Sequence, residues 1–318
     1  MSEGNAATPP PTRRPTVRDV ARAAGVSVAV VSYSFNRPDR VAGPTRERVL
    51  ATAAAIGYRG PDPAARALRL GRHGAVALVG AGQVEELLTD PAAALVARGL
   101  ARACDLAGIA LVLSGGREAG VDGTVLLRDA SVERRPGSRI VVVDGDAPEG
   151  VPRVLAHVEE GAAAAAAHLA ARGARRLAVL GWPGAGPRLD GARRGWGETG
   201  PVHALISPDT RRATGEVAAR AALRAEPRPD AILGLADGLA LGALDAAHHI
   251  GLAVPGDLLV AGIDDLPGSD LVGLTTVFVP YRPMGELAGG MLAALIEGDE
   301  VEPPPPLPTS LAIRRSTG

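Results

Sequence analysis

The chain has 318 residues, of which 46% are apolar and 22% are charged, a composition typical of a folded protein with two or three domains. No apolar run approaches the roughly 18 residues that a membrane-spanning helix needs. The opening residues lack the apolar core of a secretion signal, so a cytoplasmic location is expected. Cys104 is the only cysteine, which excludes a disulfide framework and a cysteine-based zinc site.

The net charge of −1 hides an asymmetry along the chain. Residues 1–72 hold twelve arginines and five acidic residues, a local net charge of +7, and the remainder carries −8. The chain contains no lysine, so its arginine content by itself is explained by GC-rich coding. The position of the charge is more informative, because a basic head on an acidic body suggests contact between the head and a polyanion.

The basic head is predicted to form short helices. Thr16 and Asp19 have the spacing of a capping box, and Gly25 can end the helix that they begin. Ser27 caps a second helix over 28–35, and a turn over 36–40 leads to a third helix that runs from Gly43-Pro44 to Gly57. Two helices joined by a short turn containing glycine are the parts of a helix-turn-helix, although an ordinary three-helix bundle would have the same core.

A fourth segment, Asp62–Arg69, has a capping residue, a proline at its first helical position and good helix formers. It is too short to be stable alone in water. We therefore expect it to fold only when something else stabilises it.

The motifs of the head resemble the DNA-binding region of the lactose/galactose repressor (LacI) family. The resemblance rests on Val17–Ser27, Val31-Ser32, Asn36, Thr45–Leu50, Gly57-Tyr58-Arg59 and Pro63–Leu68. It implies a homodimer on a pseudo-palindromic DNA operator, with a recognition helix in each major groove. It also implies that the hinge helices pair in the central minor groove, where Leu68 would wedge between base pairs.

The resemblance assigns DNA contacts residue by residue. It places Val28, Ala29 and Tyr33 at base-reading positions, and Arg40, in the loop after the helix, at another DNA-contact position. Val28 and Ala29 can offer only apolar contact, for instance to a thymine methyl group. The alternative is that they are ordinary helix residues that do not contact the bases. The positions that usually touch phosphates are Thr16, Ser27, Ser32 and Asn36.

The body alternates apolar runs with alanine-rich helical stretches, which predicts an α/β fold of two doubly wound lobes. The same family resemblance implies a periplasmic-binding-protein-like sensor. Its second lobe would start near residue 156, and the chain would return to the first lobe around 275–296. Strands are expected at 75–80, 109–113, 121–127, 140–143, 177–180, 202–206, 231–235, 258–263 and 309–314, and helices at 91–107, 159–172, 211–225, 237–249 and 282–296.

Four regions follow from these patterns: an N-terminal arm (1–15), a helix-turn-helix domain (16–60), a hinge (61–73) and a sensing and dimerisation domain (74–318). Motif resemblance places Arg188 and Asp264 at the effector cleft, and a small polyol or sugar would suit them. A strand-end salt bridge is the alternative role for this pair. Further candidate ligand residues are Asp237, Glu160 and Asp90.

No nucleotide-binding loop, nucleophile elbow or metal-ligand pattern is present, so the sequence predicts neither an enzyme nor a cofactor. Two hypotheses remain. The chain is a ligand-responsive regulator, most simply a repressor, or an operator-binding protein whose degenerate sensor only holds a dimer together.

Overall fold

The computed structural model describes residues 15–36, 40–58, 72–115, 120–128 and 137–318. Contacts divide the chain into two compact units, residues 1–74 and residues 75–318, and each unit is described by itself. The predicted hinge helix and Leu68 lie outside the described residues, as do residues 1–14 of the predicted arm.

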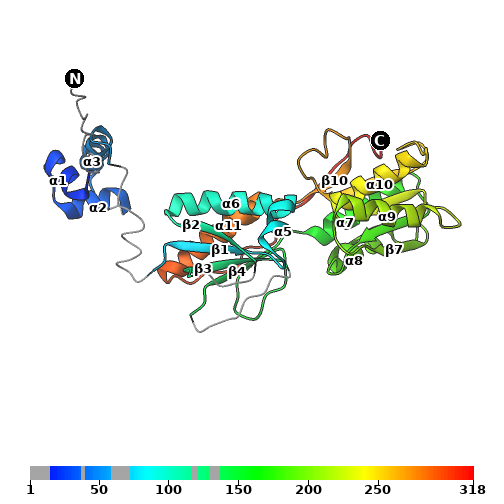
Figure 1. The fold of residues 1–318 in the computed structure, drawn as a ribbon, viewed down its shortest axis with the longest axis horizontal. Helices are drawn as coiled ribbons and strands as arrows, with labels where there is room; N and C mark the ends of the chain where they lie inside the picture. Colours follow the sequence, from blue (N-terminus) through cyan, green and yellow to red (C-terminus); the bar gives the residue numbers. More distant parts are fainter. Residues whose placement is uncertain (1–14, 37–39, 59–71, 116–119, 129–136) are drawn as a thin grey trace, which may run out of the picture. The chain divides into compact units, whose positions relative to one another are not determined.

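The head consists of α1 (Val17–Ala24), α2 (Val28–Asn36) and α3 (Gly43–Ala55) in its described part (Figure 1). The Asp19 carboxylate accepts hydrogen bonds from the backbone N–H and the hydroxyl of Thr16, at 2.8 and 2.7 Å, and so fixes the start of α1. Gly25 ends the helix with a left-handed φ of 66°. The helices enclose a small core of Val20, Ala21, Ala24, Val31, Val49 and Ala53.

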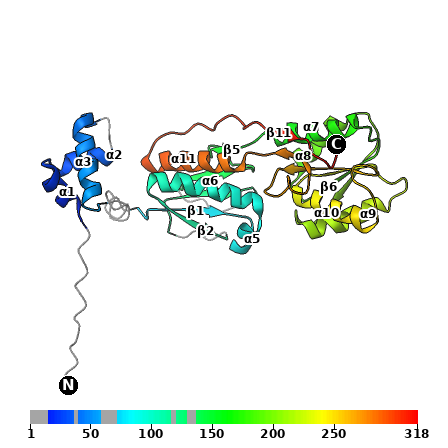
Figure 2. The ribbon, with the colours of Figure 1, turned by 90° about the horizontal axis from the view of Figure 1, so that it is seen from above.

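The first lobe of the body is built on a parallel sheet with the order β2-β1-β3-β4-β5. Helices α6 and α11 lie side by side against it, although they are far apart in sequence (Figure 2). Small residues allow this close approach, as at Gly99 of α6 and Gly285 of α11. The elements are β1 (Ala75–Val79), α5 (Val84–Thr89), α6 (Pro91–Ala107), β2 (Ala110–Ser114), β3 (Gly123–Leu127), β4 (Ile140–Val143), β5 (Arg153–Val154) and α11 (Tyr281–Glu297).

The second lobe has a sheet of order β11-β10-β9-β8-β6-β7, parallel except for β11, which is antiparallel to β10. Helices α7 and α8 pack together against one face, and α9 and α10 pack against the other. The elements are α7 (Val158–Ala171), β6 (Leu177–Gly181), α8 (Gly186–Trp196), β7 (Val202–Ile206), α9 (Arg212–Leu223), β8 (Ala231–Gly234), α10 (Asp237–His249), β9 (Leu259–Asp264), β10 (Thr275–Phe278) and β11 (Ser310–Ala312).

The chain passes between the lobes at three places: after β5, after β10 and before β11. The first and third crossings are paired, because Leu307 donates to Leu155 at 2.8 Å and accepts from His157 at 2.9 Å. One expectation needs correction. Residues 275–278 form a strand of the second sheet, so the return to the first lobe begins only after Phe278.

Helices α5 and α8 and strands β5 and β10 were not expected from the sequence pattern. No helix in the described part of the chain is long and apolar enough to cross a membrane.

Candidate DNA-binding face and effector cleft

The second helix of the head presents a distinct outer face. Val28 and Tyr33 have 44% and 45% of their surface exposed, and Ala29 between them is exposed as well. Val31 and Ser34, on the opposite side of α2, are fully buried. Residues four apart on a helix are neighbours, so Ala29 and Tyr33 lie side by side, and Val28 at the start of α2 is exposed as well. An apolar and aromatic face of this kind can reach thymine methyl groups in a major groove.

The predicted phosphate-contacting groups lie around this helix. The Ser27 hydroxyl accepts from the backbone N–H of Val30 at 3.2 Å and caps α2. The Thr16 hydroxyl donates to Asp19, so a phosphate contact would require it to turn. Arg40 is exposed just after the undescribed residues 37–39, Ser32 is half-buried, and Asn36 ends α2.

A cleft of about 600 Å³ that contains several charged residues lies at the carboxyl ends of the body's strands, with walls from both lobes. The first lobe contributes Asp90, at the start of α6, and Arg128, directly after β3. The second lobe contributes Arg188 of α8 and Asp264 at the end of β9. Ligands of open α/β sheets bind at this edge, because loops and helix N-termini converge there.

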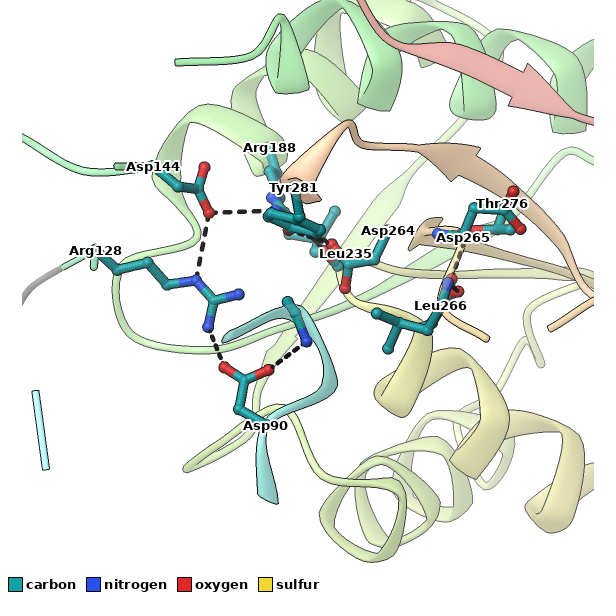
Figure 3. Close-up of polar contacts among 12 residues, drawn as sticks. Asp90, Arg128, Asp144, Arg188, Leu235, Asp264, Asp265, Leu266, Thr276 and Tyr281 are labelled. Carbon is teal, nitrogen blue, oxygen red and sulfur yellow. Dashed lines mark hydrogen bonds and ion pairs between the residues drawn. The ribbon is translucent and has the colours of Figure 1, made fainter. Parts of the chain in front are cut away.

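The predicted pair, Arg188 and Asp264, is in contact and nearly enclosed (Figure 3). Each residue is 5% exposed, and Nη1 of Arg188 donates to Asp264 at 2.8 Å and to the Leu235 carbonyl at 2.7 Å. Nη2 of Arg188 donates to the Tyr281 hydroxyl at 2.7 Å, and that hydroxyl donates to Asp264 at 2.6 Å. Burial would lower the pKa of Arg188, but the oxygens of Tyr281, Asp264 and Asp144 outweigh it and raise that pKa.

A second arginine joins this network from the first lobe (Figure 3). Arg128 donates to Asp90 at 2.6 Å and to Asp144 at 3.3 Å, and its guanidinium lies 6.0 Å from the centre of the Tyr281 ring. Asp144 is also 3.9 Å from Arg188, so its carboxylate meets arginines of both lobes. The result is a chain of alternating charges that runs across the cleft.

The sequence motifs did not assign Arg128, Asp144 or Tyr281 to the cleft. Arg128 and Asp144 each come directly after a buried parallel strand, and this was the available signal. Their backbones have φ of 54° and 57°, and Asp264 and Asp265 have 129° and 52°. Among the described residues these four are the only non-glycine positions with positive φ. Such strained residues cluster at functional sites.

Two predicted ligand residues are placed differently from the expectation. Asp237 is fully buried, and its carboxylate accepts from the hydroxyls of Ser269 and Thr276 and from the Leu266 N–H. It therefore ties α10 to the strands beside it and is not an open ligand group. Glu160 does not line the cleft: its side chain is 61% exposed and pairs with His157 at 3.4 Å.

Asp237 gives a pH-dependent prediction. Burial, and then the charge of Asp264, raises its pKa to about 6, although its hydrogen bonds partly oppose the shift. A carboxyl whose pKa is raised on folding stabilises the fold at low pH, and this contribution is lost as pH rises through about 6. Asp237→Asn keeps one oxygen for the Leu266 N–H. We expect it to be more stable than wild type by about 2 kcal/mol at pH 8 and equally stable near pH 4.

Urea unfolding of the full chain at the two pH values measures this difference. An equal effect of Asp237→Asn at both values would show that Asp237 does not titrate in this range.

Together, the exposed helix face of the head and the polar cleft of a two-lobed α/β body define a class. They are the parts of a DNA-binding transcription regulator with a ligand-sensing domain.

Comparison with known proteins identifies the family. Residues 16–60 match the model for bacterial regulatory proteins of the lacI family, and residues 166–317 match a periplasmic binding protein-like domain. The HTH-type transcriptional regulator Rv3575c of Mycobacterium tuberculosis is 34% identical over 90% of this chain and 92% of its own. The chain belongs to the LacI family of transcription regulators, and its relatives are regulators rather than enzymes.

Two further relatives are informative. The ribose operon repressor of Halalkalibacterium halodurans is 28% identical over 95% of this chain and 97% of its own. The solved structure of a complex of the regulator CelR with cellobiose has a TM-score of 0.67 and 28% identity. It covers 95% of this chain and all of that one.

Proposed function

We propose that this protein is a repressor that binds a pseudo-palindromic operator as a homodimer through α2 of each head. The observation that carries the proposal is the exposed face of Val28, Ala29 and Tyr33, set against the buried Val31 and Ser34. Arg40, Thr16, Ser27, Ser32 and Asn36 are proposed to hold this face against the DNA backbone, and Leu68 to wedge into the minor groove.

Tyr33→Ala tests the operator contact. We expect it to weaken operator binding by about 1–3 kcal/mol, roughly 5- to 150-fold, because it removes an exposed base contact without opening the core. Anisotropy titrations on promoter DNA near the gene measure the loss, and binding to unrelated DNA at low salt is the control. Binding should also weaken steeply with salt, since phosphate contacts release counterions. Unchanged operator affinity in the variant would refute the assignment of α2.

We further propose that the cleft binds a small sugar or polyol through Arg188, Asp264 and Asp90. The cellobiose complex of CelR supports this class of effector. Because the cleft spans both lobes, a ligand that binds one arrangement of the lobes better would shift their equilibrium and thereby control the head.

A second function, a sensor that serves only for dimerisation, is favoured by one observation. Arg128 and Arg188 are each already paired with carboxylates of the protein. A thermal-shift screen of the full chain against sugars and polyols separates the two. A ligand at 100 times its Kd should stabilise the fold by about 2.7 kcal/mol, whereas a pure scaffold would respond to none.

A further inference from the structure

A second, apolar cavity of about 300 Å³ lies beside the effector cleft in the second lobe. Glycines at 181, 184 and 186 leave room in its wall, and its apolar surface comes from Val179, Ala185, Leu189, Ala204, Ile206 and Leu235. A dry cavity of about 150 Å³ is large enough for benzene, so this cavity admits a ring with a substituent.

Trp182 connects the cavity with the effector cleft, because its side chain lines both. The Arg188 guanidinium lies 5.4 Å from the centre of the Trp182 ring, so the indole borders the charged part of the cleft as well. A molecule held by Arg188 would therefore lie close to the residue that the two spaces share. We call this cavity the side pocket.

Ser207 lies in the chain between a residue of the side pocket and a residue of the cleft, but it lines neither space. It follows Ile206, which lines the side pocket, and precedes Pro208, which lines the cleft. Its N–H donates to the Gly181 carbonyl at 2.7 Å, but its hydroxyl, in a residue only 2% exposed, has no hydrogen-bond partner among the described residues. A buried hydroxyl without a partner is costly, but a ligand could reach this one only if the residues that cover it moved.

We propose that the side pocket is an effector subsite for a compact apolar group, such as an aryl or short alkyl substituent. The effector would place its hydroxylated part on Arg188 and Asp264. An ether or ester oxygen would join this part to the apolar group. This inference rests on the proposed function of the cleft and narrows its ligand from a free sugar to a glycoside or ester.

The test compares matched ligands by calorimetry on the full-length protein: methyl and phenyl β-D-glucopyranoside, and the same pair of galactopyranosides. In whichever pair binds, the phenyl glycoside should bind at least about tenfold more tightly than the methyl glycoside, since burial of a phenyl ring is favourable. Ala204→Phe fills the side pocket and should reduce the ratio to about one. His203→Phe adds the same ring to the other face of β7, outside both cavities, and should leave the ratio unchanged.

Equal affinities of wild type for the methyl and phenyl glycosides would overturn the side pocket and leave the cleft proposal intact. A ratio that survives Ala204→Phe would also overturn it. If no glycoside binds, benzyl alcohol tests the side pocket separately. Binding that is lost in Ala204→Phe and kept in His203→Phe would support the pocket while the sugar proposal fails, and no binding would overturn both.

Discussion

Arg188→Ala is expected to destabilise the body by about 3–5 kcal/mol and to abolish any effector response. The arginine and Asp264 are both nearly enclosed, so removal of the guanidinium leaves a buried carboxylate without its cation. The Leu235 carbonyl and the Tyr281 hydroxyl lose a donor in the same step. Urea unfolding measures the loss of stability. Operator titration below the unfolding temperature, with and without a responding ligand, measures the loss of response.

A matched control lies on the same helix. Arg193 of α8 pairs with Asp190 at 3.7 Å, but both side chains are more than half exposed, so Arg193→Ala should change stability by less than about 0.5 kcal/mol. Arg188→Ala combined with Asp264→Ala should recover part of the stability, because no charge is then left unpaired. If the double variant is as unstable as the sum of the two single variants, the pair is not coupled and the cause is lost packing.

The same network limits how an effector can act. Asp144 lies between Arg128 of the first lobe and Arg188 of the second, so the lobes are joined through charges that already satisfy one another. A ligand that enters must replace these contacts with its own hydroxyls or charges. It changes the arrangement of the lobes only if it does so better in one arrangement than in the other.

Most strands of the body could be predicted because each is a short, continuous apolar run, the pattern of a parallel strand buried on both faces. Strands β5 and β10 could not, because β5 has only two residues and β10 begins with two threonines. Helix α8 could not, since Pro187, Gly191 and Gly195 make its sequence a poor helix former. The packing explains these glycines. A Cβ at Gly191 would lie 2.1 Å from the Glu159 carbonyl oxygen, and one at Gly195 would lie 2.0 Å from that of Ala163. Contact with α7 therefore requires the glycines that local propensity penalises.

Residues of the cleft could be predicted only where they belong to a recognisable sequence motif. Arg188 and Asp264 were found by motif and lie in contact. Arg128 and Asp144 come from different strands of the other lobe, and no spacing in the sequence links them to Arg188. Asp237 was a further candidate ligand residue, but the structure buries it and it does not line the cleft. The direction of its side chain, toward Ser269 and Thr276, depends on tertiary contacts.

Two glycines of α11 should respond in opposite ways to the same substitution. A Cβ at Gly285 would lie 2.1 Å from the carbonyl oxygen of Val96 and 3.0 Å from the backbone nitrogen of Leu100. Backbone atoms of α6 cannot turn aside as a side chain can, so the two helices would have to separate. We expect Gly285→Ala to cost about 3 kcal/mol.

Gly290 lies in the same helix, but a Cβ there meets nothing within 4 Å. Gly290→Ala should therefore stabilise the protein by about 0.5–1 kcal/mol, because alanine loses less conformational freedom than glycine when the helix forms. Urea unfolding of both variants beside wild type gives the two changes. Opposite signs would show that the glycines of α11 are required only where the helix meets α6. A similar loss of stability in both variants would show that a contact of α11 other than the one with α6 also requires glycine.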